Sequence, residues 1–359
     1  GDILIMAYTT VNKSTDYFNT KLYTGDGNST QAITGVGHQP DLVWLKNRSD
    51  STWHQLIDAV RGTGAANTLA SNSNEGDGGG STNQYGFISA LSSDGFTVSA
   101  GTSNASVVNH NGNNYASWNW KANGAGSANT DGSINTTATS VNTTAGFSIS
   151  KYTGTGANAT VGHGLGVAPS MIIVKNLAGG SDNWSVYHEK LGANKWLKLN
   201  TTDASATDTT IWNNTAPTSA VFSVGTYTNN NGNGNGMIAY CFAEKAGYSK
   251  FGSYTGNGNA DGTFVYTGFK PALVMCKRTD GGTQNWCIMD NKRGYNPDVQ
   301  QLHPNNSNAE SLGSGDTLDL LSNGFKMRAT DGDKNGSGET FIYMAIGQSI
   351  VGSNNVPCT

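Results

Sequence analysis

A Tyr-Thr-Gly tripeptide occurs three times in this chain of 359 residues, and the residues that follow it recur at fixed distances. Each tyrosine is followed 17 positions later by a proline, six positions after that by a lysine, and then by a tryptophan. The three sets are Tyr23, Pro40, Lys46 and Trp53; Tyr152, Pro169, Lys175 and Trp184; and Tyr254, Pro271, Lys277 and Trp286. A spacing kept in three copies predicts a repeated structural unit.

The recurrence predicts six segments. They are an N-terminal segment (1–22), unit 1 (23–122), a linker and strand (123–151), unit 2 (152–244), unit 3 (254–347) and a C-terminal tail (348–359). After each proline an apolar, largely β-branched or aromatic run precedes a polar turn and a second run that starts at tryptophan, which predicts a hairpin. The closing run "MIAYCF" (237–242) is apolar almost throughout, as in a central sandwich strand. We expect a helix only in short pieces such as "WHQLIDAV" (53–60).

Composition supports a β-rich fold. Glycine accounts for 48 residues and charged residues for only 13%, and Asn, Ser and Thr fill much of the remainder. These residues favour turns and strands over helix interiors. Eight Trp, fourteen Tyr and eleven Phe supply enough apolar area for cores, which argues against disorder. The prediction is an all-β chain of three tandem β-sandwich or jelly-roll-like units of about 100 residues each.

Charge and hydropathy exclude two classes of partner. The formal net charge of −4 provides no basic field for a nucleic-acid backbone. The apolar stretch 3–8 is too short to span a bilayer, so we expect no membrane insertion. Because the chain starts at Gly1, either the N-terminus was processed or the numbering begins inside a longer gene product.

The number and spacing of the cysteines predict neither a disulfide framework nor a zinc-binding motif. Cys241, Cys276, Cys287 and Cys358 are few for this length and show no CxxC spacing. A hairpin turn centred between Gly281 and Gly282 would place Cys276 directly opposite Cys287. Two interpretations remain open for this pair, a disulfide or two buried thiols.

Three stretches carry a family resemblance. They are "PDLVWLKNRSDSTWHQLIDAVRG" (40–62), "YTGTGANATVGHGLGVAPSMIIVKN" (152–176) and "FGSYTGNGNADGTFVYTGFKPALVM" (251–275). The chain resembles a family of virion proteins of marine and cyanobacterial phages, of the tail-fibre type, with lectin-like (concanavalin-like) β-sandwich modules. The resemblance implies an extracellular place on the virion surface, with other virion proteins and host cell-surface polysaccharide as partners. It implies no catalytic residues.

The resemblance leaves function and assembly open. Our first interpretation is an adhesin, a tail fibre or receptor-binding protein that contacts host-surface glycans. The alternatives are a non-binding structural protein (capsid decoration, head fibre or fibre shaft) and, less favoured, a polysaccharide-degrading enzyme. Phage fibres are often homo-oligomers, so we expect a homo-oligomer, a trimer. An internally triplicated chain could instead form a pseudo-threefold monomer.

Two matching pentapeptides are candidate ligand-binding motifs. "DAVRG" (58–62) and "DNKRG" (290–294) align Asp58 with Asp290 and Arg61 with Arg293, whereas unit 2 has "HEKLG" (188–192). The aspartates could accept hydrogen bonds from sugar hydroxyls beside the arginines. The alternative, which we favour, is that each Asp–Arg pair orients a turn that the glycine closes.

Tryptophans outside the repeated positions are the candidate sugar-stacking platforms. Exposed aromatic rings can stack on the apolar face of a sugar. Trp44, Trp196 and Trp212 are therefore predicted at unit-specific surfaces. The three tryptophans at repeated positions are predicted to lie in the core.

One loop resembles the start of a calcium-binding loop. In "DGDKNGSGE" (331–339), Asp331, Asp333, Asn335 and Glu339 have the spacing of oxygen ligands. Ile342 stands where a bidentate glutamate would be needed, so a hairpin turn remains the alternative. Apart from this calcium candidate, the sequence predicts no cofactor.

Overall fold

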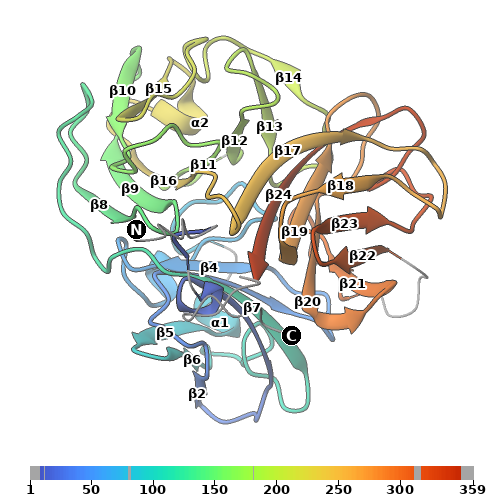
Figure 1. Cartoon of the computed structure of the whole chain (residues 1–359). Helices are drawn as coiled ribbons and strands as arrows, with labels where there is room; N and C mark the ends of the chain where they lie inside the picture. Colours follow the sequence, from blue (N-terminus) through green and yellow to red (C-terminus); the bar gives the residue numbers. More distant parts are fainter. Residues whose placement is uncertain (1–8, 12, 80–81, 181, 311–316, 349–359) are drawn as a thin grey trace, which may run out of the picture.

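The computed structural model describes residues 9–11, 13–79, 82–180, 182–310 and 317–348. Figure 1 shows three lobes around a common centre, coloured blue to cyan, green to yellow, and orange to red. The all-β prediction is confirmed, because the helical elements are single turns: η1 (Ser14–Asp16), η2 (Ala65–Asn67), α1 (Thr82–Tyr85) and α2 (Thr228–Asn231). None of the helices in the described part of the chain has the length and apolar character needed to cross a membrane.

Unit 1 is a two-layer sandwich. Its layers are the sheets β1-β7-β3-β4 and β2-β6-β5. The strands are β1 (Phe18–Thr24), β2 (Thr30–Thr34), β3 (Leu42–Asn47), β4 (Gln55–Asp58), β5 (Phe87–Ser92), β6 (Gly95–Ser99) and β7 (Asn114–Trp120). The helix expected at 53–60 is wrong, because β4 pairs with β3 and is buried at all four positions. A strand buried on both faces has no alternation of apolar and polar residues to distinguish it from a short helix.

Unit 2 pairs a seven-stranded sheet, β14-β13-β12-β11-β16-β9-β8, with the two-stranded sheet β10-β15. The strands are β8 (Ala138–Asn142), β9 (Phe147–Thr153), β10 (Ala159–Gly162), β11 (Met171–Asn176), β12 (Ser185–His188), β13 (Lys195–Lys198), β14 (Ala206–Thr207), β15 (Val221–Val224) and β16 (Gly236–Phe242). The predicted linker therefore supplies β8 and most of β9 to this sheet. In unit 1, β1 likewise starts before Tyr23, so the sheets begin earlier than the predicted boundaries.

Unit 3 has a single eight-stranded sheet, β17-β24-β19-β20-β21-β22-β23-β18. The strands are β17 (Ser249–Thr255), β18 (Phe264–Tyr266), β19 (Lys270–Arg278), β20 (Cys287–Tyr295), β21 (Asp298–Leu302), β22 (Leu318–Leu321), β23 (Gly324–Met327) and β24 (Thr340–Gln348). The pairing of β20 with β21 shifts register between Met289 and Gly294, and such irregularities bend a sheet. The sheet folds over itself, because β22 and β23 contact β19.

The residues that recur in the sequence occupy matching positions in the three sheets. Lys46, Lys175 and Lys277 are fully buried and stand opposite Ala116, Ile238 and Ile342 on the neighbouring strand. The hydroxyls of the recurring tyrosines each donate to a backbone carbonyl, at 2.6, 2.6 and 2.7 Å. The three pairs are Tyr23 with Val108, Tyr152 with Asn230, and Tyr254 with Lys334. The repeated residues therefore make the same structural contact three times.

One predicted equivalence is shifted by a residue. The backbone amides of Trp184 and Trp286 donate to the side chains of Asn200 and Asn305, and in unit 1 the amide of His54, not of Trp53, donates to Asn72. His54 thus occupies the tryptophan position, and Trp53 is only half-buried.

The rings at this position connect the units cyclically. Trp184 donates from Nε1 to the carbonyl of Ala70 in unit 1 at 3.0 Å, and Trp286 donates to Lys198 in unit 2 at 2.9 Å. His54 Nε2 lies 3.0 Å from the carbonyl oxygen of His303 in unit 3. In each contact a side-chain ring at the tryptophan position meets a carbonyl that lies two residues before the asparagine of another unit. The three contacts form a ring within a single chain.

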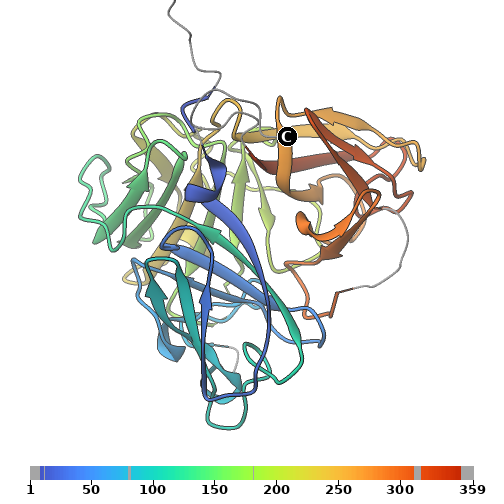
Figure 2. The same cartoon turned by 60° about the horizontal axis from the view of Figure 1, so that its bottom comes forward.

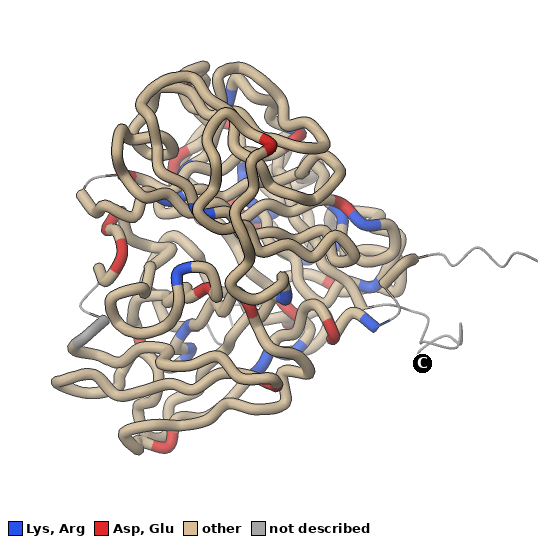
Figure 3. Tube along the Cα trace, turned by 90° about the vertical axis from the view of Figure 1, so that its left-hand side faces the viewer, with Lys and Arg blue, Asp and Glu red and all other residues tan. Residues whose placement is uncertain are grey.

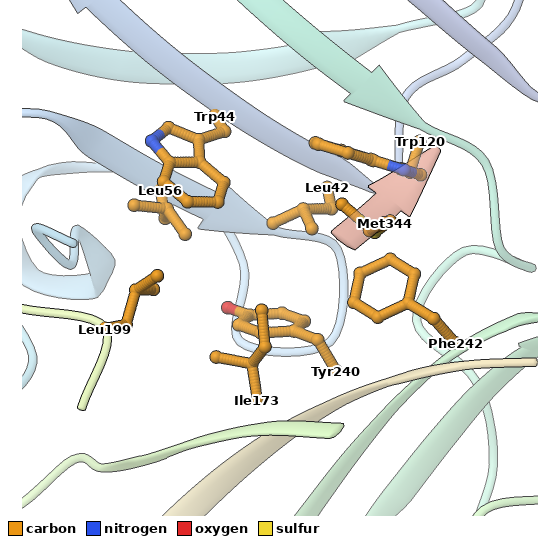
Figure 4. A pocket seen from close by; sticks show the side chains of 9 residues that line it. All are labelled: Leu42, Trp44, Leu56, Trp120, Ile173, Leu199, Tyr240, Phe242 and Met344. Atoms are coloured by element: carbon orange, nitrogen blue, oxygen red, sulfur yellow. The ribbon is translucent and has the colours of Figure 1, made fainter. Parts of the chain in front are cut away.

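A central apolar core lies where the three lobes meet (Figure 2). It contains residues of every unit, such as Trp44, Tyr240 and Met344, while each unit has a second core of its own. Figure 4 shows a gap in the central core between side chains of the three units. Its volume of about 10 Å³ leaves room for at most one water molecule, and its lining is apolar, so it is a packing gap and not a ligand site.

Candidate functional site

The Asp–Arg motif of unit 3 is buried at an interface between units. Arg293 donates from Nε to Oδ2 of Asp290 at 2.6 Å and from Nη1 to Glu310 at 2.8 Å, with both residues of the pair fully buried. The indole of Trp118, in unit 1, donates to the same Asp290 oxygen at 2.9 Å. Burial alone would lower the pKa of Arg293, but the Asp290 and Glu310 carboxylates raise it above its ordinary value. The charged groups of this motif therefore bind one another and Trp118 inside the protein and are not exposed to a ligand.

Unit 1 repeats this arrangement. Arg61 donates from Nε to Oδ2 of Asp58 at 2.6 Å and also binds Asp77, and the hydroxyl of Tyr240 from unit 2 donates to Asp58. In unit 2 the position of Asp58 is held by His188, whose Nε2 lies 3.2 Å from the carbonyl oxygen of Tyr343 in unit 3. These contacts agree with the structural interpretation of the motif and leave Asp58, Arg61, Asp290 and Arg293 inaccessible to a sugar.

The tryptophans chosen as sugar platforms are also inaccessible, so that prediction is wrong. Trp44, Trp196 and Trp212 are 3%, 4% and 1% exposed. Trp44 points into the central core, where its Nε1 donates to His54 Nδ1, and the other two belong to the core of unit 2. Trp44 is buried because the units meet one another through different side chains, whereas Trp196 and Trp212 are buried because each unit fills its own core with different side chains.

The side chains of the predicted calcium loop bind other groups of the protein. Asp331 pairs with Lys334, and Glu339 pairs with Arg278. Both carboxylate oxygens of Asp333 accept hydrogen bonds from Asn285. The side-chain amide of Asn335 donates to the side chain of Asn257 and accepts from its backbone amide. The four side chains bind different partners and are not gathered round a shared oxygen-lined site, so the loop does not resemble a calcium cage.

The cysteine register predicted from the turn is confirmed. Cys276 in β19 stands directly opposite Cys287 in β20. Both thiols are free and buried, as is Cys241, while Cys358 lies outside the described residues together with the tail from residue 349.

A pocket on unit 3 is accessible from solvent, unlike the buried tryptophans and Asp–Arg pairs that the sequence offered as ligand sites. It lies at the bend of the sheet, next to the DNKRG motif, and encloses about 250 Å³. Its lining consists of Lys270, Asn291, Gly294, Tyr295, Asn296, Val299 and Leu320. Tyr295, at the end of β20, is 77% exposed, the highest value among the large hydrophobic side chains that are exposed in the described residues. We call this the Tyr295 pocket.

The local backbone explains how Tyr295 is presented. Gly294 has φ +88°, and a Cβ there would lie 2.2 Å from the carbonyl oxygen of Asp298, so the tight β20–β21 turn requires glycine. The buried Arg293 immediately before it anchors the turn. The motif that the sequence indicated therefore contributes Asn291 and Gly294 to the pocket lining, and Tyr295 follows it directly, whereas its Asp290 and Arg293 are buried.

The pocket combines an aromatic surface with available polar groups. In the described part of the chain, no hydrogen bond or ion pair engages the side chain of Lys270 or Asn291. An amide and an ammonium beside an exposed tyrosine ring can bind hydroxyl groups while the ring covers an apolar face. The aligned residues are Ala59 and Thr63 in unit 1 and Glu189 and Ala193 in unit 2, so the set belongs to unit 3.

A second groove lies between units 2 and 3 and encloses about 540 Å³. It contains two carboxylates, each paired with a lysine: Glu189 with Lys190 at 2.8 Å, and Glu244 with Lys250 at 2.7 Å. Burial raises the pKa of Glu189, but hydrogen bonds from Lys190 and Ser170 lower it more, and the net shift is downward. A general acid for glycoside cleavage needs a raised pKa, so this carboxylate does not favour hydrolysis.

Charged residues of both signs are dispersed over the trace in Figure 3. This distribution, with the net charge of −4, does not provide a basic surface for polyanions.

Comparison with known proteins gives a family but no activity. No curated protein and no solved structure matches the chain. The family described as a domain of unknown function (DUF7483) matches residues 13–349, which is nearly the whole chain. The protein therefore belongs to the DUF7483 family.

Proposed function

We propose that the protein is a non-catalytic adhesin of a phage virion, which binds host-surface glycans in the Tyr295 pocket. The observation that carries the proposal is the 77% exposed Tyr295 ring beside the unengaged side chains of Lys270 and Asn291. The virion location rests on the family resemblance of the sequence, and the binding role rests on this pocket.

The surface of unit 3 supports the proposal further. Phe264 and Tyr266, 45% and 63% exposed, are in β18 of the same unit. Alternate residues of a strand point to the same side, so these two rings share one face. All the exposed large aromatic side chains of the described residues therefore belong to unit 3, as expected if one unit binds and the others complete the ring.

A glycan array followed by titration of the best ligand tests the proposal. The wild-type chain is compared with Tyr295→Ala and with Tyr266→Ala, a control that removes another exposed tyrosine of the same unit outside the pocket. We expect Tyr295→Ala to weaken binding about tenfold, equivalent to about 1.4 kcal/mol, and Tyr266→Ala to bind as wild type. Equal effects of both substitutions would place binding elsewhere. No binding on the array and no adsorption to host cells would reject the adhesin in favour of a structural virion protein.

A further inference from the structure

A cysteine, a histidine and an aspartate meet in unit 3 at a place that the Tyr295 pocket does not include. One ligand atom each of Cys287, His303 and Asp333 lies within 4.8 Å of the other two. Cys287 begins β20, His303 follows β21, and Asp333 is in the loop between β23 and β24. The fold thus brings together residues from three separate segments.

The spacing suits a tetrahedral metal ion. Zinc binds thiolate sulfur at about 2.3 Å and histidine nitrogen at about 2.0–2.1 Å, which places two such ligands about 3.5 Å apart. Cys287 Sγ and His303 Nδ1 are 3.8 Å apart. Thiolate and imidazole together favour zinc over calcium or magnesium, which bind oxygen ligands.

A second thiol lies beside the cluster but is not part of it. Cys276 stands directly opposite Cys287 across β19 and β20 and is fully buried, and its sulfur is not among the three clustered ligand atoms. Cys287 is also buried, whereas His303 and Asp333 are half-buried, so the cluster has one side in the core and the other near solvent. A metal ion could enter from the half-buried side.

Neighbouring groups hold the ligands in place. Asn285 donates its backbone amide to Oδ1 of Asp333 at 2.7 Å and its side-chain amide to Oδ2 at 3.0 Å. Such outer contacts orient ligands in metal sites. The carbonyl oxygen of Trp286 lies 3.0 Å from Nδ1 of His303, a contact that this nitrogen gives up when it binds the metal.

The local charges also balance. A zinc ion with one thiolate and one carboxylate among its ligands has no surplus charge. The buried Lys334 ammonium, next in sequence to Asp333, is paired with the Asp331 carboxylate and also donates to Gln301, so this ion pair adds no net charge beside the site.

The other two units provide an internal comparison. Strand register aligns Cys276 and Cys287 with Leu45 and Gln55 in unit 1 and with Val174 and Ser185 in unit 2. The matching asparagine and tyrosine contacts place Ala70 and Val107, or Lys198 and Asn229, where unit 3 has His303 and Asp333. Neither of these sets can bind zinc, so the shared fold does not require the four residues.

We propose that unit 3 binds one zinc ion through Cys287, His303 and Asp333, with a water molecule in the fourth position. The proposal assigns Asp333 a different role from the calcium loop that its sequence spacing suggests. It is independent of the Tyr295 pocket, so glycan binding and zinc binding can succeed or fail separately.

Cobalt substitution tests the proposal on the full chain. The protein, reduced and treated with a chelator, is titrated with Co²⁺, and absorption in the thiolate-to-cobalt charge-transfer region is recorded. We expect saturation at one ion per chain, with the band lost when Zn²⁺ displaces Co²⁺. Cys287→Ser should abolish the band, and Asp333→Asn should weaken affinity at least tenfold, whereas Cys241→Ser, a buried cysteine of unit 2, should leave both unchanged.

Two outcomes of the cobalt titration would overturn the site. One is the absence of a charge-transfer band from reduced, folded wild-type protein. The other is a band that survives Cys287→Ser and Asp333→Asn but disappears in Cys241→Ser. If Cys287→Ser does not fold, the wild-type stoichiometry and Asp333→Asn decide the question. Recovery of Cys276 and Cys287 as a disulfide that persists in metal-supplemented protein would also reject the proposal.

Discussion

The hydroxyl of Tyr240 in β16 donates a 2.8 Å hydrogen bond to Oδ2 of Asp58 in β4, although 182 residues separate the two in the chain. The indole of Trp118 makes the matching contact to Asp290 across 172 residues. Each contact joins the central strand of one unit to the buried Asp–Arg pair of another. The pairs that resemble ligand-binding motifs in the sequence are therefore links between units.

Tyr240→Phe removes the hydroxyl and should lower the free energy of unfolding by about 1.5–3 kcal/mol, the usual value for a hydrogen bond to a charged group. Urea denaturation of the variant and wild type measures the loss. Tyr266→Phe is the matched control, because that hydroxyl is on a 63% exposed side chain, and its effect should stay within about 0.5 kcal/mol. A loss no larger than the control's would contradict the linking role of Tyr240.

Asp290→Ala should be more severe. It leaves Arg293 buried with Glu310 as its remaining carboxylate and deprives the Trp118 indole of its acceptor. Breaking a buried ion pair typically costs about 3–5 kcal/mol. Asp16→Ala breaks the exposed Lys13–Asp16 pair and should cost at most about 1 kcal/mol. Similar unfolding midpoints for the two variants would show that the buried pair contributes no more than the surface pair.

The buried Lys46 should make stability rise with pH. Burial lowers its pKa to about 7, although the Asp50 and Glu310 carboxylates partly oppose the shift. Between this value and the ordinary lysine pKa of about 10.4, the unfolded chain binds more protons at this residue than the folded chain does, so raising the pH favours folding. Below pH 7 the lysine is charged in both states and the contribution is constant.

Lys46→Met tests this contribution by difference. We expect the increase in unfolding free energy between pH 7.5 and pH 9.5 to be smaller in the variant than in wild type. Lys270→Met, which removes an exposed lysine, should retain the wild-type increase. Parallel stability curves for Lys46→Met and wild type would show that Lys46 keeps an ordinary pKa.

Gly294→Ala should damage both the turn and the Tyr295 pocket. Its φ of +88° is strained for alanine, and the new Cβ would lie 2.2 Å from the carbonyl oxygen of Asp298. Gly234→Ala is the matched control, because Gly234 also has a positive φ, +76°, but no atom within 4 Å of the Cβ position.

Gly234→Ala should lower the free energy of unfolding only by the conformational cost of about 1–2 kcal/mol. Gly294→Ala should lose more stability and also weaken glycan binding. If it matches Gly234→Ala in stability and binds glycans as wild type, the turn does not position Tyr295 as the structure indicates.

Local patterns in the sequence predicted the β class and several positions within it. Because side chains on paired strands stand opposite each other in a fixed register, the turn at Gly281–Gly282 predicted the pairing of Cys276 with Cys287. The apolar run 237–242 predicted a central strand, and β16 is buried there at every position. These predictions depend on contacts between neighbours in the chain, which the local sequence specifies.

The sequence spacing failed where one unit meets another. The spacing aligned Trp53 with Trp184 and Trp286, but His54 occupies that position. His54 contacts unit 3 in the same way that Trp184 contacts unit 1 and Trp286 contacts unit 2. The spacing also placed Trp44 on the surface, although the inner face of its sheet is covered by the other two units. The Tyr295 pocket was missed because its residues become neighbours only where the sheet bends.

The sequence by itself therefore determined the β class, the register of the hairpin at Gly281–Gly282 and the tyrosine and lysine positions that recur in the three units. Tertiary structure decided which side chains are accessible, because a sheet that packs on both faces buries residues whose local pattern resembles a surface. It also brought Cys287, His303 and Asp333 together from three separate segments. Such contacts depend on chain closure over long distances, which the spacing of residues within a segment does not encode.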